Sequence, residues 1–309
     1  MEDQLVVACG LGLAAAHGCA GHTAIIRERT VPFYSLALEC YGRAVRAGRW
    51  TGEVPYRSGT TPVTAHLFPG AAGAPLLVVC GGVDTWKVEL HRTAAAAGSG
   101  VTVAVLDMPG TGESRVPLAA DADTILAAAV QRIAEHTGAR RTAFLGISFG
   151  GHWAAKLALT GRVDAAAGIG GPVGAADHAP DLTTLPGAMP GIVAHALGLP
   201  ALPGPEDAAR FAAAFSLRRQ GLLDAALHVP LLAANGTSDP YVPVEDTAVF
   251  GCDPNATVWL VRDAAHCASE HLATLMPAVL AWLRHRLGGD EESAGRLERA
   301  RRSLTPLLA

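Results

Sequence analysis

The chain has 309 residues, of which 50% are hydrophobic and 17% charged, and its formal net charge is −4. A chain of this length and hydrophobicity can bury a large core, so it fits one α/β domain with insertions, or a domain with a small cap. Lys and Arg are scattered, apart from one basic cluster near the C-terminus whose interleaved Glu298 is typical of a solvated helix face. We therefore expect no nucleic-acid partner.

Two features favour a cytoplasmic protein with no membrane partner. The apolar run at residues 5–16 follows Glu2 and Asp3 and no basic residue, which is the wrong flank for a signal peptide, and it is too short to span a bilayer. The six cysteines show no C-x-x-C spacing, so we expect reduced, mostly buried thiols rather than a disulfide framework or a zinc site. We predict no metal and no cofactor.

The predicted elements begin with an amphipathic helical stretch at residues 22–50, followed from Pro62 onward by apolar runs that alternate with helical patterns. Expected strands lie at 63–68, 75–80, 101–106, 142–147, 163–169, 229–234 and 256–261, and expected helices near 86–97, 122–137, 149–160, 244–250 and 268–287. The turn at 58–61 lies just before the run at 63–68. We expect this run to be the second strand of an antiparallel pair at one edge of the sheet. This alternation predicts an α/β fold with a mostly parallel twisted sheet and helices on both faces.

One long insertion interrupts the alternation. Residues 171–228 lie between two predicted core strands, are rich in Pro, Gly and Ala, and carry expected helices near 187–198 and 205–226. We divide the chain into an N-terminal helical cap segment (1–52), an α/β core (53–170 and 229–288), a lid insertion (171–228) and a C-terminal helix (289–309).

The most informative motif is Gly146-Ile-Ser148-Phe-Gly150, which joins a predicted strand to a predicted helix. In that context G-x-S-x-G is typical of a nucleophile elbow, where the serine sits on a sharp, strained turn. The flanking glycines remove the Cβ atoms that would collide there. An ordinary βα turn of small residues is the alternative interpretation.

A nucleophilic serine needs a general base, and the base needs an orienting acid. Where such an elbow supplies the nucleophile on a parallel sheet, the chain order is serine, then acid, then histidine. Asp239 follows the predicted strand that ends near Gly236, and His266 follows the last predicted strand. Asp239 could instead be an ordinary turn residue, Asp263 is a rival acid, and His271 is a rival base.

Acyl transfer also needs two amide donors for the oxyanion. One is expected from Phe149, the residue after the nucleophile, and the second from Val83 or next from Gly82, in the loop after an early strand. The Met108-Pro-Gly-Thr-Gly112 turn could be mistaken for a phosphate loop, but no G-K-[ST] follows, so a nucleotide site is not favoured.

These motifs together resemble the FrsA-like esterases of the α/β-hydrolase fold, over most of the chain from Pro62 to Leu287. The same branch holds the dihydropseudooxynicotine hydrolases and the fungal polyketide-shortening hydrolases. The segments that carry the resemblance are Val54-Pro-Tyr with Gly59, Gly81-Gly-Val-Asp-Thr-Trp-Lys-Val-Glu89, Asp107-Met-Pro-Gly-Thr-Gly112 and Gly146-Ile-Ser-Phe-Gly-Gly151.

The resemblance implies a helical cap before the sheet, the triad Ser148, Asp239 and His266, and a loop near the oxyanion hole shaped by Asp84, Lys87 and Glu89. We expect Lys87 and Glu89 to form a structural pair rather than to act in catalysis. Substrate contacts are expected from Asp84, Trp86, Trp153, Tyr241, Asp177 and His178. Asp181 is a further possible helper in the lid, although a surface turn is the favoured interpretation for the lid residues.

The sequence therefore predicts a serine hydrolase that cleaves an ester-type bond of a small apolar or aromatic carbonyl compound through an acyl-enzyme. Alternatives are carbon–carbon bond hydrolysis of a β-diketone or polyketide-like substrate, and acyl transfer or cyclisation by the same triad. A non-catalytic ligand-binding protein is the remaining alternative. The expected partners are the small-molecule substrate and, as a possibility, a second copy of the chain in a homodimer.

Overall fold

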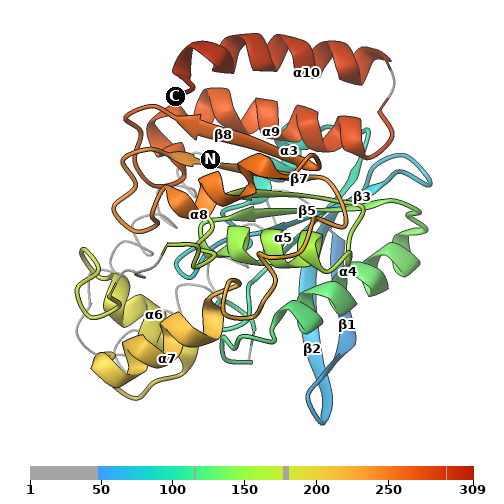
Figure 1. Cartoon of the computed structure of the whole chain (residues 1–309). Helices are drawn as coiled ribbons and strands as arrows, with labels where there is room; N and C mark the ends of the chain where they lie inside the picture. The colour runs from blue at the N-terminus through green and yellow to red at the C-terminus, as the bar shows by residue number, and fades with distance from the viewer. Residues whose placement is uncertain (1–47, 115, 177–180, 290) are drawn as a thin grey trace, which may run out of the picture.

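An eight-stranded mixed sheet forms the centre of the molecule (Figure 1). The computed structural model describes residues 48–114, 116–176, 181–289 and 291–309. The strand order is β1-β2-β4-β3-β5-β6-β7-β8. The strands are β1 (Gly48–Tyr56), β2 (Gly59–Phe68), β3 (Leu76–Cys80), β4 (Thr102–Leu106), β5 (Thr142–Ile147), β6 (Ala165–Ile169), β7 (Leu231–Gly236) and β8 (Ala256–Val261).

The sheet is antiparallel at one edge and parallel elsewhere. β1 pairs antiparallel with β2, and β2 pairs antiparallel with β4, while β4, β3, β5, β6, β7 and β8 run parallel. The predicted fold class and antiparallel edge are confirmed. β1 begins at Gly48, inside the range assigned to the N-terminal segment, and the rest of that segment lies outside the described residues.

Helices cover both faces of the sheet, which explains why its central strands are apolar at almost every position. One core lies between the sheet and α4 (Asp123–Thr137) with α5 (Phe149–Leu159). The other lies between the sheet and α3 (His91–Ala97) with α9 (Leu272–Arg286). Two further helices lie outside these layers: α8 (Glu245–Ala248) follows β7, and α10 (Glu291–Leu304) packs on α9. The short 3₁₀ helices are η1 (Val249–Cys252), η2 (His266–His271) and η3 (Thr305–Leu307).

The insertion between β6 and β7 carries two helices, α6 (Met189–Leu197) and α7 (Pro205–Phe215), beside one end of the sheet (Figure 1). The predicted helix at 205–226 is too long, because α7 ends at Phe215. Ser216 is extended, with φ −75° and ψ 111°, and the Leu217 N–H leaves the helix to donate to the Val173 carbonyl at 2.9 Å. The chain after α7 therefore returns to the start of the insertion.

The last residues of the chain lie along the outer edge of β8. The Arg262 N–H donates to the Leu307 carbonyl at 2.8 Å, and the Ala309 N–H donates to the Leu260 carbonyl at 2.8 Å. Leu308 forms an antiparallel bridge with Val261. None of the described helices combines the length and apolar character needed to cross a membrane.

Candidate active site

Ser148 occupies a sharp turn between β5 and α5. Its φ of 56° and ψ of −127° lie in a sparsely populated region, where a non-glycine residue costs roughly 1–3 kcal/mol. The turn is fixed by hydrogen bonds from the Ser148 N–H to the Ile169 carbonyl at 2.7 Å and from the Gly151 N–H to the Ser148 carbonyl at 2.8 Å. A Cβ at Gly146 would collide with the Gly150 carbonyl group, and one at Gly150 would lie 2.6 Å from the Cys80 carbonyl oxygen, so this turn requires both glycines.

Three side chains from separate loops form a hydrogen-bonded line at the carboxyl end of the parallel strands. His266 Nε2 lies 2.9 Å from Ser148 Oγ, and His266 Nδ1 lies 2.6 Å from Asp239 Oδ2. Because the Asp239 carboxylate can only accept, Nδ1 carries the proton, and Nε2 is left to accept from the serine hydroxyl. This is the geometry of a nucleophile, a general base and an orienting acid.

Asp239 is held as an anion beside His266. Its side chain is 1% exposed, and its Oδ1 accepts the backbone N–H groups of Tyr241 at 2.7 Å and Val242 at 3.1 Å. Burial raises the pKa of Asp239, but the hydrogen bond and charge of His266 outweigh it, and the net pKa lies below the usual value. Burial lowers the pKa of His266, but the hydrogen bonds and charges of Asp239 and Cys267 together outweigh it and raise that pKa above its usual value.

Asn235 connects the acid loop to the histidine loop, a role that the sequence analysis did not identify. This fully buried residue of β7 donates from Nδ2 to Asp239 Oδ2 at 2.8 Å and accepts the Cys267 N–H on Oδ1 at 3.0 Å. Cys267 and Ala268 have positive φ values of 58° and 48°, so the backbone after His266 is held in an unfavourable conformation. A polar side chain inside an otherwise apolar strand was the available signal.

The rival residues lie elsewhere. Asp263 is exposed, and its N–H donates to Thr237 Oγ1 at 2.8 Å at the end of β8. His271 forms the N-cap of α9, while the His266 ring reaches Ser148. The structure therefore joins Asp239 and His266, rather than Asp263 or His271, to the serine.

The loop after β3 lies directly against the nucleophile. A Cβ at Gly82 would be 2.8 Å from Ser148 Oγ and 3.2 Å from the Phe149 nitrogen, so only glycine permits this approach. Val83 lines the pocket above Ser148, and the Phe149 amide begins α5. Gly82 therefore lies against the serine hydroxyl and the Phe149 amide, and Val83 lines the same pocket as Ser148.

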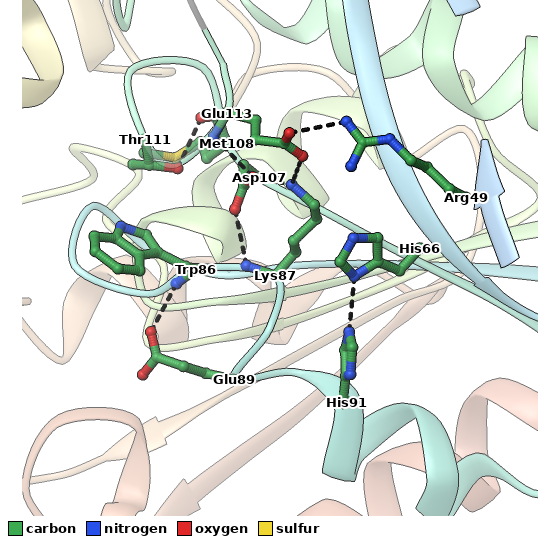
Figure 2. A network of polar contacts seen from close by, with 10 residues as sticks. All are labelled: Arg49, His66, Trp86, Lys87, Glu89, His91, Asp107, Met108, Thr111 and Glu113. Carbon is green, nitrogen blue, oxygen red and sulfur yellow. Dashed lines mark hydrogen bonds and ion pairs between the residues drawn. The ribbon is translucent and has the colours of Figure 1, made fainter. Parts of the chain in front are cut away.

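A buried charge network supports this loop, and it corrects one expectation (Figure 2). The Lys87 ammonium contacts Asp107 and Glu113, whereas Glu89 accepts the Trp86 N–H at 2.9 Å. The predicted Lys87–Glu89 pair is therefore wrong. The Lys87 side chain is fully buried. The backbone N–H of Lys87 also donates to Asp107 Oδ1 at 2.8 Å, which ties the loop after β3 to the loop after β4.

An apolar pocket opens beside the triad. Its described lining contains no Lys or Arg, and most of its wall comes from the insertion and from the segments that flank it. The lining residues are Val83, Ser148, Phe149, Pro172, Gly174, Ala176, Leu182, Leu185, Met189, Val193, Phe211, Ala212, Phe215, Ser216, Tyr241, Val242, Pro243, Asp246 and His266. Such a lining suits an uncharged, apolar ligand group.

The expected substrate contacts divide into three sets. Tyr241 lines the pocket, and its ring lies 5.2 Å from that of His266. Trp86 and Trp153 do not line it: Trp153 is fully buried against Phe149 and Phe215, because α5 packs all of its faces in the core. Asp84 is half-buried beside Val83 and is not part of the lining.

The last set belongs to the lid. Asp177 and His178 lie outside the described residues. Asp181 is exposed and accepts the Thr183 N–H at 2.9 Å, which is a turn role. Among the described residues no group of His, Cys, Asp and Glu is arranged to hold a metal ion.

Comparisons with known proteins identify the family and the fold of the chain. The model of the Esterase FrsA-like family matches residues 52–287. Esterase FrsA of Salmonella typhi is 26% identical over 243 residues, covering 74% of this chain and 57% of the relative, and Esterase FrsA of Salmonella newport gives the same identity and coverage. The chain therefore spans 57% of the length of these curated relatives.

Solved structures share the fold at low sequence identity. AbyA5 has a TM-score of 0.72 at 18% identity and covers 96% of this chain and 84% of its own. The 2,6-dihydroxy-pseudo-oxynicotine hydrolase has a TM-score of 0.69 at 22% identity, with coverages of 93% and 84%, and carboxylesterase CesB of Bacillus subtilis has a TM-score of 0.57 at 19% identity, with coverages of 83% and 98%. With the family model matching more than half of its length, this chain belongs to the FrsA-like esterase family of the α/β-hydrolase fold.

Proposed function

We propose that this chain is a serine esterase that hydrolyses esters with uncharged, apolar acyl groups through an acyl-enzyme. One observation carries the proposal: the hydrogen-bonded line Ser148–His266–Asp239 opens into an apolar pocket whose described lining lacks Lys and Arg. Membership of an esterase family supports the same reaction class.

The reaction proceeds in two matched steps. Ser148 Oγ attacks the ester carbonyl carbon while its proton passes to His266 Nε2, and the carbonyl oxygen becomes an oxyanion near the amides of Phe149 and Val83. The intermediate collapses, and the alcohol leaves with the proton from His266. A water then attacks the acyl-enzyme with His266 again as base, releasing the acid and restoring Ser148.

Ester cleavage is favoured over carbon–carbon cleavage by the acids available in the pocket. A carbanion leaving group must be stabilised and protonated, whereas an alkoxide needs only the proton carried by His266. Asp246 is the one further carboxyl group among the described lining residues, and its oxygens accept four backbone N–H groups. It is therefore occupied in holding the backbone.

A labelling and hydrolysis experiment tests the proposal. A fluorophosphonate probe should label the wild type, and p-nitrophenyl esters from acetate to octanoate should be hydrolysed. Ser148→Ala should abolish labelling and lower kcat by roughly 10⁴–10⁶-fold, because the nucleophile is lost.

Ser269→Ala is the matched control, since this exposed serine lies in the same loop as His266 and contacts Glu270. It should leave labelling and turnover unchanged. Equal labelling of the wild type and Ser148→Ala would refute the nucleophile. Turnover of aromatic β-diketones without turnover of esters would replace the ester reaction with carbon–carbon hydrolysis.

A further inference from the structure

Asp246, in the short helix α8, has an unusual set of partners. It is 3% exposed, and its Oδ2 accepts the N–H groups of Val173 at 2.7 Å and Gly174 at 3.0 Å. Its Oδ1 accepts the N–H groups of Ala175 at 2.7 Å and Ala176 at 3.4 Å. One carboxylate thus satisfies four consecutive backbone donors at the point where the insertion leaves the core.

The carbonyl groups of the same segment are joined to the other end of the insertion. Leu217 N–H, Ser216 Oγ and Arg218 Nε donate to the carbonyl oxygens of Val173, Gly174 and Ala175, in that order, at 2.9, 3.1 and 3.1 Å. We call residues 172–176 and 216–218 the lid neck. Its two sides are hydrogen-bonded to each other, and Asp246 binds its first side to the core.

A buried histidine holds the start of the lid neck. The Pro172 carbonyl lies 2.9 Å from His152 Nδ1, and because a carbonyl only accepts, His152 donates from Nδ1. His152 is itself fully buried in α5, beside the nucleophile turn. The lid neck is therefore fixed to the core at both Pro172 and the four amides bound by Asp246.

The lid neck is also a wall of the apolar pocket. Pro172, Gly174, Ala176 and Ser216 line that pocket together with Asp246. At Gly174 the φ is +66°, and a Cβ would lie 2.7 Å from Ser216 Oγ, so the two sides of the neck are in close contact. Helix α7, which supplies Phe211 to the pocket, ends directly at this neck, and α6 supplies Met189 to the same pocket.

From this geometry we propose that Asp246 is a positioning residue that sets the acyl-group selectivity of the pocket by fixing the lid neck. A carboxylate has about four lone-pair sites, and the four amides occupy them, so Asp246 shapes the wall rather than binding substrate. This proposal deepens the esterase function and rests on it. Short acyl groups need only the triad and the oxyanion amides, whereas long ones also need the wall.

The test compares long and short esters in Asp246→Asn. An amide oxygen retains two of the acceptor sites, but its NH₂ group faces backbone N–H groups and cannot accept from them. We expect kcat/KM for p-nitrophenyl octanoate to fall by about 10–100-fold, mostly through KM, because the wall that orients the chain is displaced. Hydrolysis of p-nitrophenyl acetate and fluorophosphonate labelling should change by less than about threefold, since the triad is untouched.

Asp253→Asn is the matched control. Asp253 likewise accepts backbone N–H groups, in its case one on each oxygen, from Leu227 and Asn255 at 2.7 and 2.8 Å, but it does not line the pocket. The Asp253→Asn variant should have the same ratio of kcat/KM for p-nitrophenyl octanoate to that for p-nitrophenyl acetate as the wild type. If Asp246→Asn lowers both esters equally, or leaves their ratio unchanged, Asp246 has no role in selectivity and the proposal is overturned.

Two further measurements keep the proposal separate from the esterase function. In the Ser148→Ala background, binding of the neutral fluorophore N-phenyl-1-naphthylamine should weaken about tenfold with Asp246→Asn and not with Asp253→Asn, whether or not the chain is an esterase. Unchanged binding would count against the proposal even if esters are hydrolysed. Should Asp246→Asn fail to fold, Arg218→Met, which removes one bond of the neck outside the pocket lining, must shift the selectivity ratio in the same direction.

Discussion

At the scale of single residues, the charge of Asp239 controls where the His266 proton resides. The carboxylate accepts from His266, Asn235, Tyr241 and Val242, so each of its oxygens has two partners. These bonds keep Asp239 ionised and its orientation fixed. The imidazole then keeps its proton on Nδ1 and presents Nε2 to Ser148.

Replacing Asp239 by Asn should change both the rate and its pH dependence. We expect kcat to fall by roughly 10⁴-fold, because the amide favours the wrong imidazole tautomer. The acid limb of kcat/KM should move to lower pH, since the carboxylate raises the pKa of His266 and activity needs neutral imidazole. A pH–rate profile measures both effects.

Asp263→Asn is the comparison for this experiment, because that exposed carboxylate is three residues from His266 in the sequence. It should preserve the wild-type profile. A mild loss in Asp239→Asn together with a large loss in Asp263→Asn would reverse the assignment of the acid.

The residues Ser148, Asp239 and His266 could be proposed from sequence because strand ends and chain order place them at one edge of a parallel sheet. The partners of Asp246 could not, since it contacts residues that are 70 to 73 positions away, across an insertion without a recognisable pattern. The Lys87 pairing was wrong for a related reason. Proximity in sequence suggested Glu89, but the side chain enters the core and meets Asp107.

At the scale of elements, the C-terminal residues act as a short additional strand on β8. Without them, the outer edge of β8 would present unpaired N–H and C=O groups, which are a template for pairing with another chain. The Arg262 N–H and the Leu260 carbonyl, both bonded to this segment, belong to that edge. The opposite edge of the sheet is the β1–β2 hairpin.

Deleting residues 305–309 should promote self-association. We expect concentration-dependent oligomers in size-exclusion chromatography with light scattering, because the edge of β8 becomes available to a second copy. Ser303→Ala, which alters the end of α10 but not the contacts with β8, should elute as the intact chain does. If the deletion variant has the same oligomeric state as the intact chain at every concentration, residues 305–309 do not prevent self-association through the edge of β8.

Element types were predictable where one physical requirement dominated. The runs that became β3 to β8 are apolar because the sheet is covered on both faces, and this pattern is local. Helix ends were less predictable: α3 begins at His91 rather than near 86, because the preceding residues form the loop that Lys87 attaches to Asp107. α7 ends early for a tertiary reason as well, namely the bonds that form the lid neck.

At the scale of the whole molecule, a buried histidine pair links the edge hairpin to the helical layer. His66 on β2 and His91 on α3 are hydrogen-bonded between Nδ1 and Nε2 at 2.9 Å (Figure 2). Burial, reinforced by the nearby positive charge of Lys87, lowers the pKa of His66 to about 4. Burial and the neighbouring His66 likewise lower the pKa of His91 to about 4.

This pair should make the fold sensitive to mild acid. Above the ordinary histidine pKa of 6.5, both rings are neutral in the folded and in the unfolded chain. The contribution of the pair to the free energy of unfolding is then fully present. As the pH falls from there toward 4, the unfolded chain binds protons that the folded chain excludes, and the free energy of unfolding decreases. Thermal unfolding across this range should show Tm falling.

The double variant His66→Gln/His91→Gln isolates the effect, because it keeps a polar pair and removes both titrations. Its Tm should fall less than that of the wild type over the same range, although the remaining groups still titrate. Parallel Tm curves for the two proteins would exclude the histidine pair as the cause.

The way the site is divided along the chain has a consequence for how such a protein diversifies. Ser148, Asp239 and His266 all follow strands of the core, whereas Met189, Val193 and Phe211 of the pocket come from α6 and α7 in the insertion. Much of the pocket wall is therefore encoded in a stretch of sequence separate from the three residues of the proposed triad, and the two stretches meet at the lid neck. Substitutions within α6 and α7 would reshape the pocket without touching the proposed triad, so related chains could keep one reaction while accepting different substrates.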